Sequence, residues 1–113
     1  MHAFDVLGDQ IRRRILELLV ETEQGSGALA NIIQKEFSIT QGAVSQHLKI
    51  LRDSGFANSR KDGVRRIYSI EEKAFLEADL WLNRFRQLWE PKLDALGMEI
   101  SRGKKQRKRK SER

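Results

Sequence analysis

Cysteine is absent from this 113-residue chain. The absence excludes disulfide bonds, thiol chemistry and cysteine-ligated metal ions, and it is typical of proteins in a reducing compartment. The sequence also lacks an uncharged apolar run of about 18 residues, which a membrane-spanning helix would need. Residues 1–10 do not show the basic and then apolar order of a secretion signal. We therefore expect a cytoplasmic protein with no membrane segment.

Groups suited to catalysis or metal binding are scarce. Histidine occurs only as His2 and His47, and the sequence has no glycine-rich phosphate-binding loop. Ser45 and His47 are too close along the chain to belong to one catalytic triad. The sequence therefore predicts no enzymatic activity, no cofactor and no transition-metal site.

The excess positive charge is concentrated at the C-terminus. The net charge is +6, yet residues 102–113 hold eight Lys or Arg against one acid, whereas residues 1–101 hold fourteen bases and fifteen acids. Because residues 101–113 carry no apolar side chain, we expect one domain over residues 1–100 and a basic, disordered tail over 101–113. Such a tail can raise nonspecific nucleic-acid affinity, or it can serve solubility alone.

Hydrophobic periodicity predicts a series of helices. Apolar residues at helical spacing indicate one helix over about 9–20 and, after a loop at 25–27, another that ends near Phe37. After a short break, Thr40 precedes a third helix that extends to Ser54, and Gly55 fits a left-handed C-cap. Two helices joined by so short a turn form a helix-turn-helix candidate.

Residues 57–70 favour a β-hairpin. Two extended arms flank Asp62-Gly63, a pair that is typical of a two-residue hairpin turn. Ser69 can then cap a helix over about 71–89, and Pro91 kinks this helix or starts a short one that reaches about Ile100. The expected fold is mainly α-helical with a small β-hairpin.

The helix expected over residues 40–54 has one apolar side and one small, polar side. Val44, Leu48 and Leu51 form a stripe that should be buried. The opposite surface carries small or amide side chains and no acid in its first two turns: Gln41, Gly42, Ala43, Ser45 and Gln46, followed by Lys49. Small side chains permit close approach to a DNA major groove, and Gln and Ser can pair with base edges. An ordinary solvated helix face is the alternative.

Four cations flank the expected hairpin turn. Arg60 and Lys61 precede the turn, and Arg65 and Arg66 follow it. Next to a helix-turn-helix, such a tip suits contacts with DNA phosphates or with the minor groove. Taken alone, a charged run of this kind can simply be solvated.

The segment TQGAVSQHLKILR, residues 40–52, resembles the signature of ArsR-type bacterial repressors. Residues 4–16 resemble that family's opening and residues 62–68 its wing, so the match spans about residues 4–96. The resemblance implies a winged helix-turn-helix homodimer whose recognition helices enter successive major grooves of an imperfect palindrome in double-stranded DNA. It also implies that DNA is contacted by Gln41, Ser45, Gln46 and His47.

Many ArsR-type proteins release DNA when they bind a metal ion, through cysteines on the first helix of the motif or through histidines and carboxylates on the dimerisation helix. Here residues 27–33 contain no cysteine, and residues 71–100 contain no histidine. The chain therefore resembles the metal-independent branch of the family, whose members often repress their own operon.

The helix expected over residues 71–89 is apolar on two sides, which suits burial against its own domain and against a second copy. Leu76 and Leu80 lie on the narrower side. The wider side, which we assign to the dimer interface, consists of Phe75, Ala78, Trp81, Leu82, Phe85, Leu88 and Trp89. A larger monomeric core is the alternative.

Two further hypotheses stay open at this point. An apolar effector could bind at the dimer interface near Trp81, Phe85 and Trp89. The protein could instead bind nucleic acid without sequence preference, as nucleoid or RNA-binding proteins do, and use mainly its basic tail.

Overall fold

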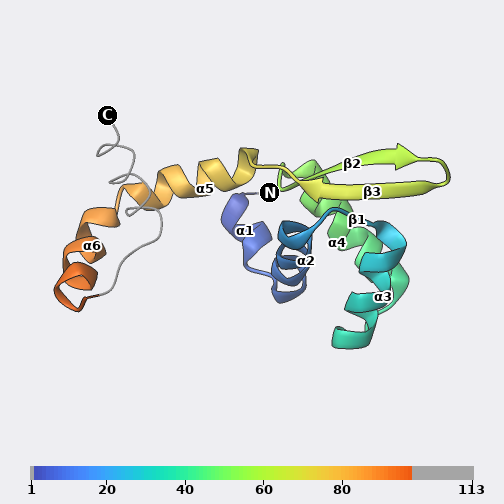
Figure 1. Cartoon of the computed structure of the whole chain (residues 1–113), viewed down its shortest axis with the longest axis horizontal. Coiled ribbons are helices and arrows are strands. Elements are labelled where there is room, and N and C mark those ends of the chain that lie inside the picture. The colour runs from blue at the N-terminus through green and yellow to red at the C-terminus, as the bar shows by residue number, and fades with distance from the viewer. Residues whose placement is uncertain (1, 98–113) are drawn as a thin grey trace. The chain divides into compact units, whose positions relative to one another are not determined.

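The computed structural model describes residues 2–97 (Figure 1). This part of the chain forms α1 (Ala3–Leu7), α2 (Gln10–Glu21), β1 (Gln24–Gly25), α3 (Ser26–Phe37), α4 (Gln41–Asp53), β2 (Ala57–Asp62), β3 (Arg65–Ile70), α5 (Lys73–Asn83) and α6 (Arg86–Ala95). One compact unit ends at Ala78, and a second begins at Asp79. The tail predicted over residues 101–113 and the end of the helix predicted to reach Ile100 lie outside the described residues.

The core of the first unit is built from one apolar side of each helix. The side chains that are completely buried belong to Val6, Ile15, Leu29, Ile33, Val44, Leu51 and Phe56. Phe56 meets Phe75 of α5 edge to face, with ring centroids 4.9 Å apart. Aromatic pairs prefer this geometry because the positive edge of one ring meets the negative face of the other. The contact ties the start of α5 to the helices that precede it.

The predicted start of α4 is confirmed, its end comes one residue before Ser54, which is the C-cap, and its caps explain both ends. Ser38 has a left-handed φ of 54° and ends α3. Thr40 then accepts a hydrogen bond from the Ala43 N–H through Oγ1 at 3.1 Å, which makes it the N-cap of α4. At the other end Gly55 has a φ of 85°, and the Phe56 N–H bonds back to the Leu51 carbonyl at 2.9 Å. This is the Schellman arrangement, which requires a residue that tolerates positive φ.

The sheet has one strand more than the sequence predicted. Its order is β1-β3-β2, all antiparallel, with Gln24 paired to Tyr68 and Gly25 to Ile67. Residues 24–25 therefore add a short edge strand, and α3 begins at Ser26, so the loop expected over 25–27 was wrong. The two residues of β1 are too few to show an alternating pattern in the sequence.

The hairpin turn lies one residue later than predicted. Asp62 pairs with Arg65, so the turn residues are Gly63 and Val64 and not Asp62-Gly63. Gly63 has a φ of 64°, and among the described residues other than glycine only Ser38 has a positive φ. Positive φ at the first turn residue alone is the pattern of a type II′ turn, which needs glycine there. Figure 1 shows the hairpin of β2 and β3 reaching beyond the helices of the first unit.

The single helix predicted over residues 71–89 was wrong. Ser69 stays in β3 and does not cap a helix, α5 begins at Lys73, and a break after Asn83 separates it from α6. Around the break the N–H groups of Arg84 and Phe85 bond three residues back, as in a tighter 3₁₀ turn. Pro91, where the sequence predicted a kink or a new start, lies inside α6.

The second unit has a charged cluster beside this break. The Arg86 guanidinium contacts the Asp79 carboxylate at 3.3 Å and the Glu90 carboxylate at 3.4 Å. Its side chain is only 14% exposed. Partly buried ion pairs of this kind add little net stability, because the cost of desolvating both groups offsets their attraction. No glycine or proline occupies residues 83–86, so the sequence pattern does not mark the break.

Candidate nucleic-acid interface

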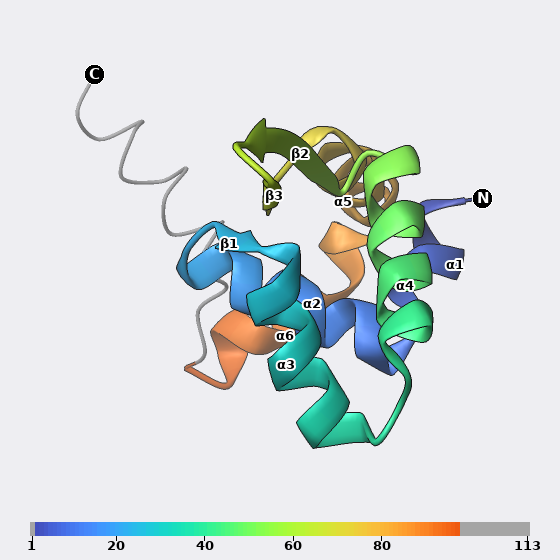
Figure 2. The same ribbon diagram turned by 90° about the vertical axis from the view of Figure 1, so that its right-hand side faces the viewer.

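The exposed side of α4 has the composition that the sequence predicted. Val44, Leu48 and Leu51 are buried, whereas Gln41, Gly42, Ser45, Gln46 and Lys49 are exposed and Ala43 is partly exposed. We call residues 41, 42, 43, 45 and 46 the α4 face. It holds no charged side chain, and its two glutamines and one serine can both donate and accept hydrogen bonds. Figure 2 shows α3 beside α4 and the hairpin of β2 and β3 near the upper end of α4.

Lys49 extends this surface, but its charge is shared. Its Nζ lies 2.8 Å from the Asp53 carboxylate one turn along the helix. The hydrogen bond from Lys49 lowers the pKa of Asp53 against the opposing effect of desolvation. Exposed pairs of this kind are weak and screened by salt, so Lys49 can exchange Asp53 for another anion at small cost.

His47 does not lie fully on the exposed side. Its side chain is 17% exposed, and Nδ1 lies 3.3 Å from Nη1 of Arg12 in α2. The Asp9 carboxylate, which caps α2 through the N–H groups of Ile11 and Arg12, lies 4.0 Å from the same nitrogen. His47 therefore occupies the boundary between the α4 face and the body. Thirty-five residues separate it from Arg12, so no local pattern in the sequence indicated this contact.

The four cations of the hairpin divide between its two faces. Side chains alternate along a strand, and Asp62 pairs with Arg65, so Arg60 and Arg65 share one face while Lys61 and Arg66 share the other. The expected single cluster of four is therefore two pairs. The hairpin with its turn is referred to below as the wing.

Two of these cations have partners in the first unit. Arg60 pairs with Glu23 at 2.8 Å, and Arg66 donates to the Ser59 hydroxyl at 3.0 Å. Lys61 and Arg65 have no ion pair or side-chain hydrogen bond within residues 2–97, and both are exposed. They are the cations of the wing that can bind an external anion without first losing an internal partner, whereas Arg60 holds the Glu23 carboxylate and Arg66 the Ser59 hydroxyl. The pairing of Arg60 with Glu23 bridges 37 residues and was not predicted.

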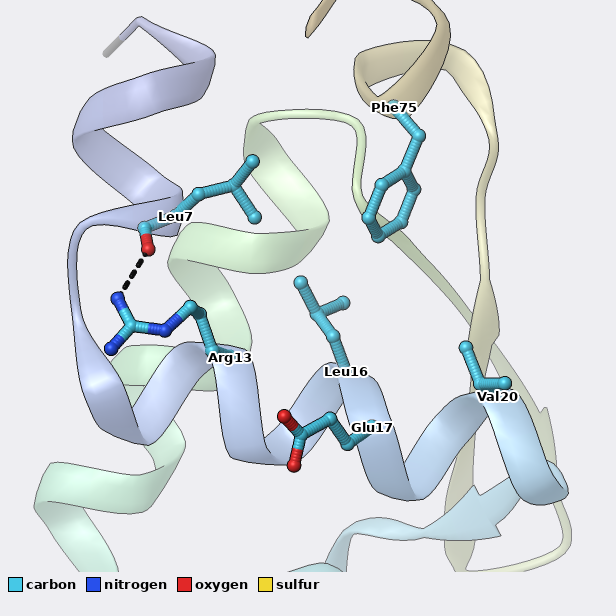
Figure 3. Close-up of a pocket in the computed structure, with 6 residues that line it drawn as sticks. All are labelled: Leu7, Arg13, Leu16, Glu17, Val20 and Phe75. Carbon is cyan, nitrogen blue, oxygen red and sulfur yellow. Dashed lines mark hydrogen bonds between the residues drawn. The ribbon is translucent and has the colours of Figure 1, made fainter. Parts of the chain in front are cut away.

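An apolar groove of about 250 Å³ lies on another part of the first unit (Figure 3). Leu7, Leu16, Val20 and Phe75 line it, and Arg13 and Glu17 stand at its sides. Nη1 of Arg13 donates to the Leu7 carbonyl at 2.7 Å, as the dashed line in Figure 3 shows. None of the lining residues belongs to the α4 face or to the wing.

The residues assigned to a dimer interface differ in their surroundings. Phe75 packs against the core and Ala78 is buried within its own protomer, while Leu76 is 52% exposed. In the second unit Leu80 is 69% exposed, and no residue of α6 is buried. The other interface candidates there are exposed or, for Trp89, half-buried: Trp81, Leu82, Phe85, Leu88 and Trp89. Trp81 and Phe85 contact each other with ring centroids 4.7 Å apart.

Neither a metal site nor a membrane helix is present in the part of the chain that the structure describes. Across residues 2–97, no three His, Asp or Glu side chains come together as a metal site would require. Within the same range no helix is both long and apolar enough to cross a membrane.

The comparisons with known proteins agree on one family. Residues 9–59 match the family model described as bacterial regulatory protein, arsR family. The HTH-type transcriptional regulator Rv2034 of Mycobacterium tuberculosis is 32% identical over 83 residues, which cover 74% of each chain. The transcriptional repressor SdpR of Bacillus subtilis is 27% identical over 84 residues, which cover 74% of this chain and 89% of SdpR.

Solved structures also indicate the ArsR family. A crystal structure of an ArsR family transcriptional regulator superposes with a TM-score of 0.66 at 30% identity, over 78% of this chain and 87% of that one. The homodimeric winged helix-turn-helix DNA-binding domain of Mb0332 from Mycobacterium bovis superposes with a TM-score of 0.56 at 26% identity. The superposition covers 76% of this chain and 78% of that one. The winged helix-turn-helix fold implied by the sequence is therefore confirmed, with a three-stranded sheet in place of a hairpin alone. The chain belongs to the ArsR family of bacterial regulatory proteins, and it is a DNA-binding transcriptional regulator and not an enzyme.

Proposed function

We propose that this regulator is a repressor that binds an imperfect palindrome in double-stranded DNA as a homodimer, without a metal cofactor. The α4 face carries the proposal. An uncharged, acid-free surface at the start of an exposed helix fits a major groove, where glutamine and serine can pair with base edges. Gln41, Ser45 and Gln46 face the bases, and Ala43 and Gly42 allow the backbone to approach closely.

Charged residues around this surface contact the DNA backbone. Lys61 and Arg65 bind phosphates directly because they are exposed and unpaired among the described residues. Lys49, Arg60 and Arg66 contribute after exchanging their present partners, Asp53, Glu23 and Ser59. Phosphate contacts of this kind set affinity and register and carry no base code.

A homodimer is supported by the apolar surface that one protomer leaves exposed. Leu76, Leu80, Trp81 and Leu88 are each more than two fifths exposed, which is unusual for a stable monomer when such residues are close along the chain. The similar domain from M. bovis is homodimeric. Two copies of α4 about 34 Å apart would meet two half-sites on one side of the DNA, which is the basis for proposing a palindrome.

Repression and metal independence rest on separate observations. The similar protein SdpR is a repressor. The chain has no cysteine and two histidines, and one of these, His47, contacts Arg12. Borderline metal ions prefer cysteine and histidine ligands, so loss of DNA binding on metal addition is not expected.

Selection of bound duplexes from a random pool tests this function. We expect an inverted repeat, bound by two protomers. Replacing Ser45 and Gln46 by Ala should then reduce the preference for the selected duplex over random DNA by about 1–3 kcal/mol for each base that is no longer contacted. Neutralising Arg65 should weaken binding to both duplexes alike.

Two outcomes would reject the proposal. If the Ser45 and Gln46 variants lose affinity equally on both duplexes, these residues do not read sequence. If a protein truncated at Ser101 shows no preferred duplex while the full chain binds any DNA, binding is nonspecific and depends on the basic tail. In that case the selected pool would contain no inverted repeat.

A further inference from the structure

Arg12 lies between α1 and α4 and bonds to both. From the first turn of α2, its Nε donates to the Val6 carbonyl at 3.0 Å and its Nη2 to the Asp5 carbonyl at 3.1 Å. Its Nη1 lies 3.3 Å from Nδ1 of His47. Arg12 thus uses three nitrogens to join the end of the first helix to the side of α4. We call this set of contacts the Arg12 bridge.

The bridge determines which nitrogen of His47 carries the proton. A guanidinium is charged at all accessible pH values and can only donate. In a hydrogen bond with this guanidinium Nδ1 can only accept, and in a neutral imidazole that accepts at Nδ1 the proton is on Nε2. Asp9 would favour the opposite arrangement, but it is farther from Nδ1, at 4.0 Å, and the same oxygen already accepts the Ile11 N–H at 2.8 Å.

The second nitrogen of His47 is open to solvent. Nε2 has no hydrogen bond to any described residue, and among these residues the one buried side-chain nitrogen or oxygen without a partner is Nε of Arg86. Nε2 is therefore not fully enclosed by the protein, in agreement with the 17% exposure of the His47 side chain. His47 is one turn along from Ala43, at the edge of the α4 face, where the walls of a DNA groove would bring phosphates and not bases.

We propose that Arg12 is a positioning residue for DNA binding, because its donation to Nδ1 holds His47 with Nε2–H available to a backbone phosphate. The inference rests on the proposed function, since it needs α4 to enter the groove. Arg12 itself does not touch DNA. Its effect passes through the orientation and tautomer of the imidazole, which link α1 and α2 to the DNA-binding helix.

Two substitutions of His47 separate the two ring nitrogens. In His47→Asn the side-chain oxygen lies near the place of Nδ1 and can accept from Arg12, but nothing replaces Nε2–H. In His47→Gln the amide nitrogen lies near the place of Nε2 and restores the outward donor. We expect His47→Asn to lose about tenfold in affinity for both the selected and a random duplex, and His47→Gln to recover part of that loss, because its outward donor is restored but is not held by Arg12.

Arg12 is tested in the same assay. Arg12→Met should weaken DNA binding by a similar factor, and in the His47→Asn background it should cost little more, because both changes remove the same phosphate interaction. Nitrogen NMR spectra of the imidazole should show an unprotonated Nδ1 and a protonated Nε2 in the wild type, and a mixture of tautomers in Arg12→Met. Thermal unfolding of each variant measures how much folded protein is present.

Several outcomes would overturn the inference. Equal losses for His47→Asn and His47→Gln would show that no outward donor acts, and a protonated Nδ1 in the wild type would show that Arg12 does not set the tautomer. Additive losses for Arg12 and His47 would mean that Arg12 acts through α1 instead. Failure of the proposed function itself is distinct, because it would leave the Ser45 and Gln46 variants with unchanged sequence preference.

Discussion

At the scale of single residues, Asp9 combines two tasks. It caps α2 by accepting the N–H groups of Ile11 and Arg12 at 2.8 and 3.0 Å. Partial desolvation alone would raise the pKa of Asp9, but the Arg12 N–H, the charge of His47 when it is protonated, the Arg12 charge and the Ile11 N–H together bring it below its ordinary value of 3.8. The ionised carboxylate is therefore favoured by folding, and it stabilises the start of the helix that carries the Arg12 bridge.

This arrangement predicts a pH-dependent stability. Asp9→Ala should lower the free energy of unfolding by about 1 kcal/mol at neutral pH, because the cap and the charge are both removed. A lowered carboxyl pKa contributes stability above pH 3.8, and that contribution is lost as pH falls through the still lower value of the folded state. Urea unfolding of the wild type and of Asp9→Ala at several pH values measures this contribution.

Asp9→Asn is the matched control, because asparagine caps a helix nearly as well but carries no charge. At neutral pH the free energy of unfolding of Asp9→Asn should lie between those of the wild type and Asp9→Ala. It should equal that of the wild type once the wild-type carboxylate is protonated. A constant difference between wild type and Asp9→Asn at all pH values would show that the charge of Asp9 adds nothing.

At the scale of elements, the wing makes its four cations unequal. Lys61 and Arg60 are adjacent in sequence and equal in charge, yet Arg60 is paired with Glu23 and Lys61 is unpaired within the described chain. Lys61→Ala should weaken binding to any duplex several-fold and reduce the slope of log affinity against log salt by about 0.9 for each phosphate that is no longer neutralised. Arg60→Ala should have the smaller effect.

Glu23→Gln provides the complementary test in the same salt titration. It frees Arg60 without changing the wing, so nonspecific affinity should rise and the salt slope should become steeper. If Arg60→Ala instead costs as much as Lys61→Ala, and Glu23→Gln changes nothing, the ion pair with Glu23 does not restrain Arg60 in solution.

The elements also show what the sequence could predict. Local chemistry was enough to predict α4. Thr40 marks its start, Gly55 marks its end, and the helical spacing of three apolar residues defines its buried side: Val44, Leu48 and Leu51. The position of the hairpin turn was wrong by one residue because Asp62-Gly63 and Gly63-Val64 both suit a tight turn. Pairing with β3, which no local rule includes, decides between them.

Contacts between residues that are far apart along the chain could not be predicted from the sequence. The Arg12 bridge and the pair of Arg60 with Glu23 span 35 and 37 residues, so periodicity cannot reveal them. The break between α5 and α6 is marked by no glycine or proline. For the candidate site, the exposed residues of α4 could therefore be predicted, but the partners that restrict His47, Lys49 and Arg60 could not.

At the scale of the whole molecule, DNA binding and self-association are coupled in the proposed function. A protomer alone offers one α4 face, and two half-sites bound together gain affinity without any new interaction, because the second is bound from within the same complex. Loss of the dimer should therefore weaken binding to an inverted repeat far more than binding to a single half-site. This difference separates a dimer variant from a variant of the α4 face.

Leu80→Glu tests that coupling, because Leu80 is 69% exposed in the protomer. Burying a leucine contributes about 1.5–3 kcal/mol, so its loss at each side of a symmetric interface should raise the dimer dissociation constant by at least tenfold. Val64→Glu is the control, since Val64 at the tip of the wing is also apolar and fully exposed. Sedimentation should show monomers for Leu80→Glu and dimers for Val64→Glu. If Leu80→Glu still sediments as a dimer and retains its preference for the inverted repeat, the side of α5 that carries Leu80 is not part of the dimer interface. Trp81 and Leu82, on the wider side to which the sequence assigned the interface, then become the residues to test.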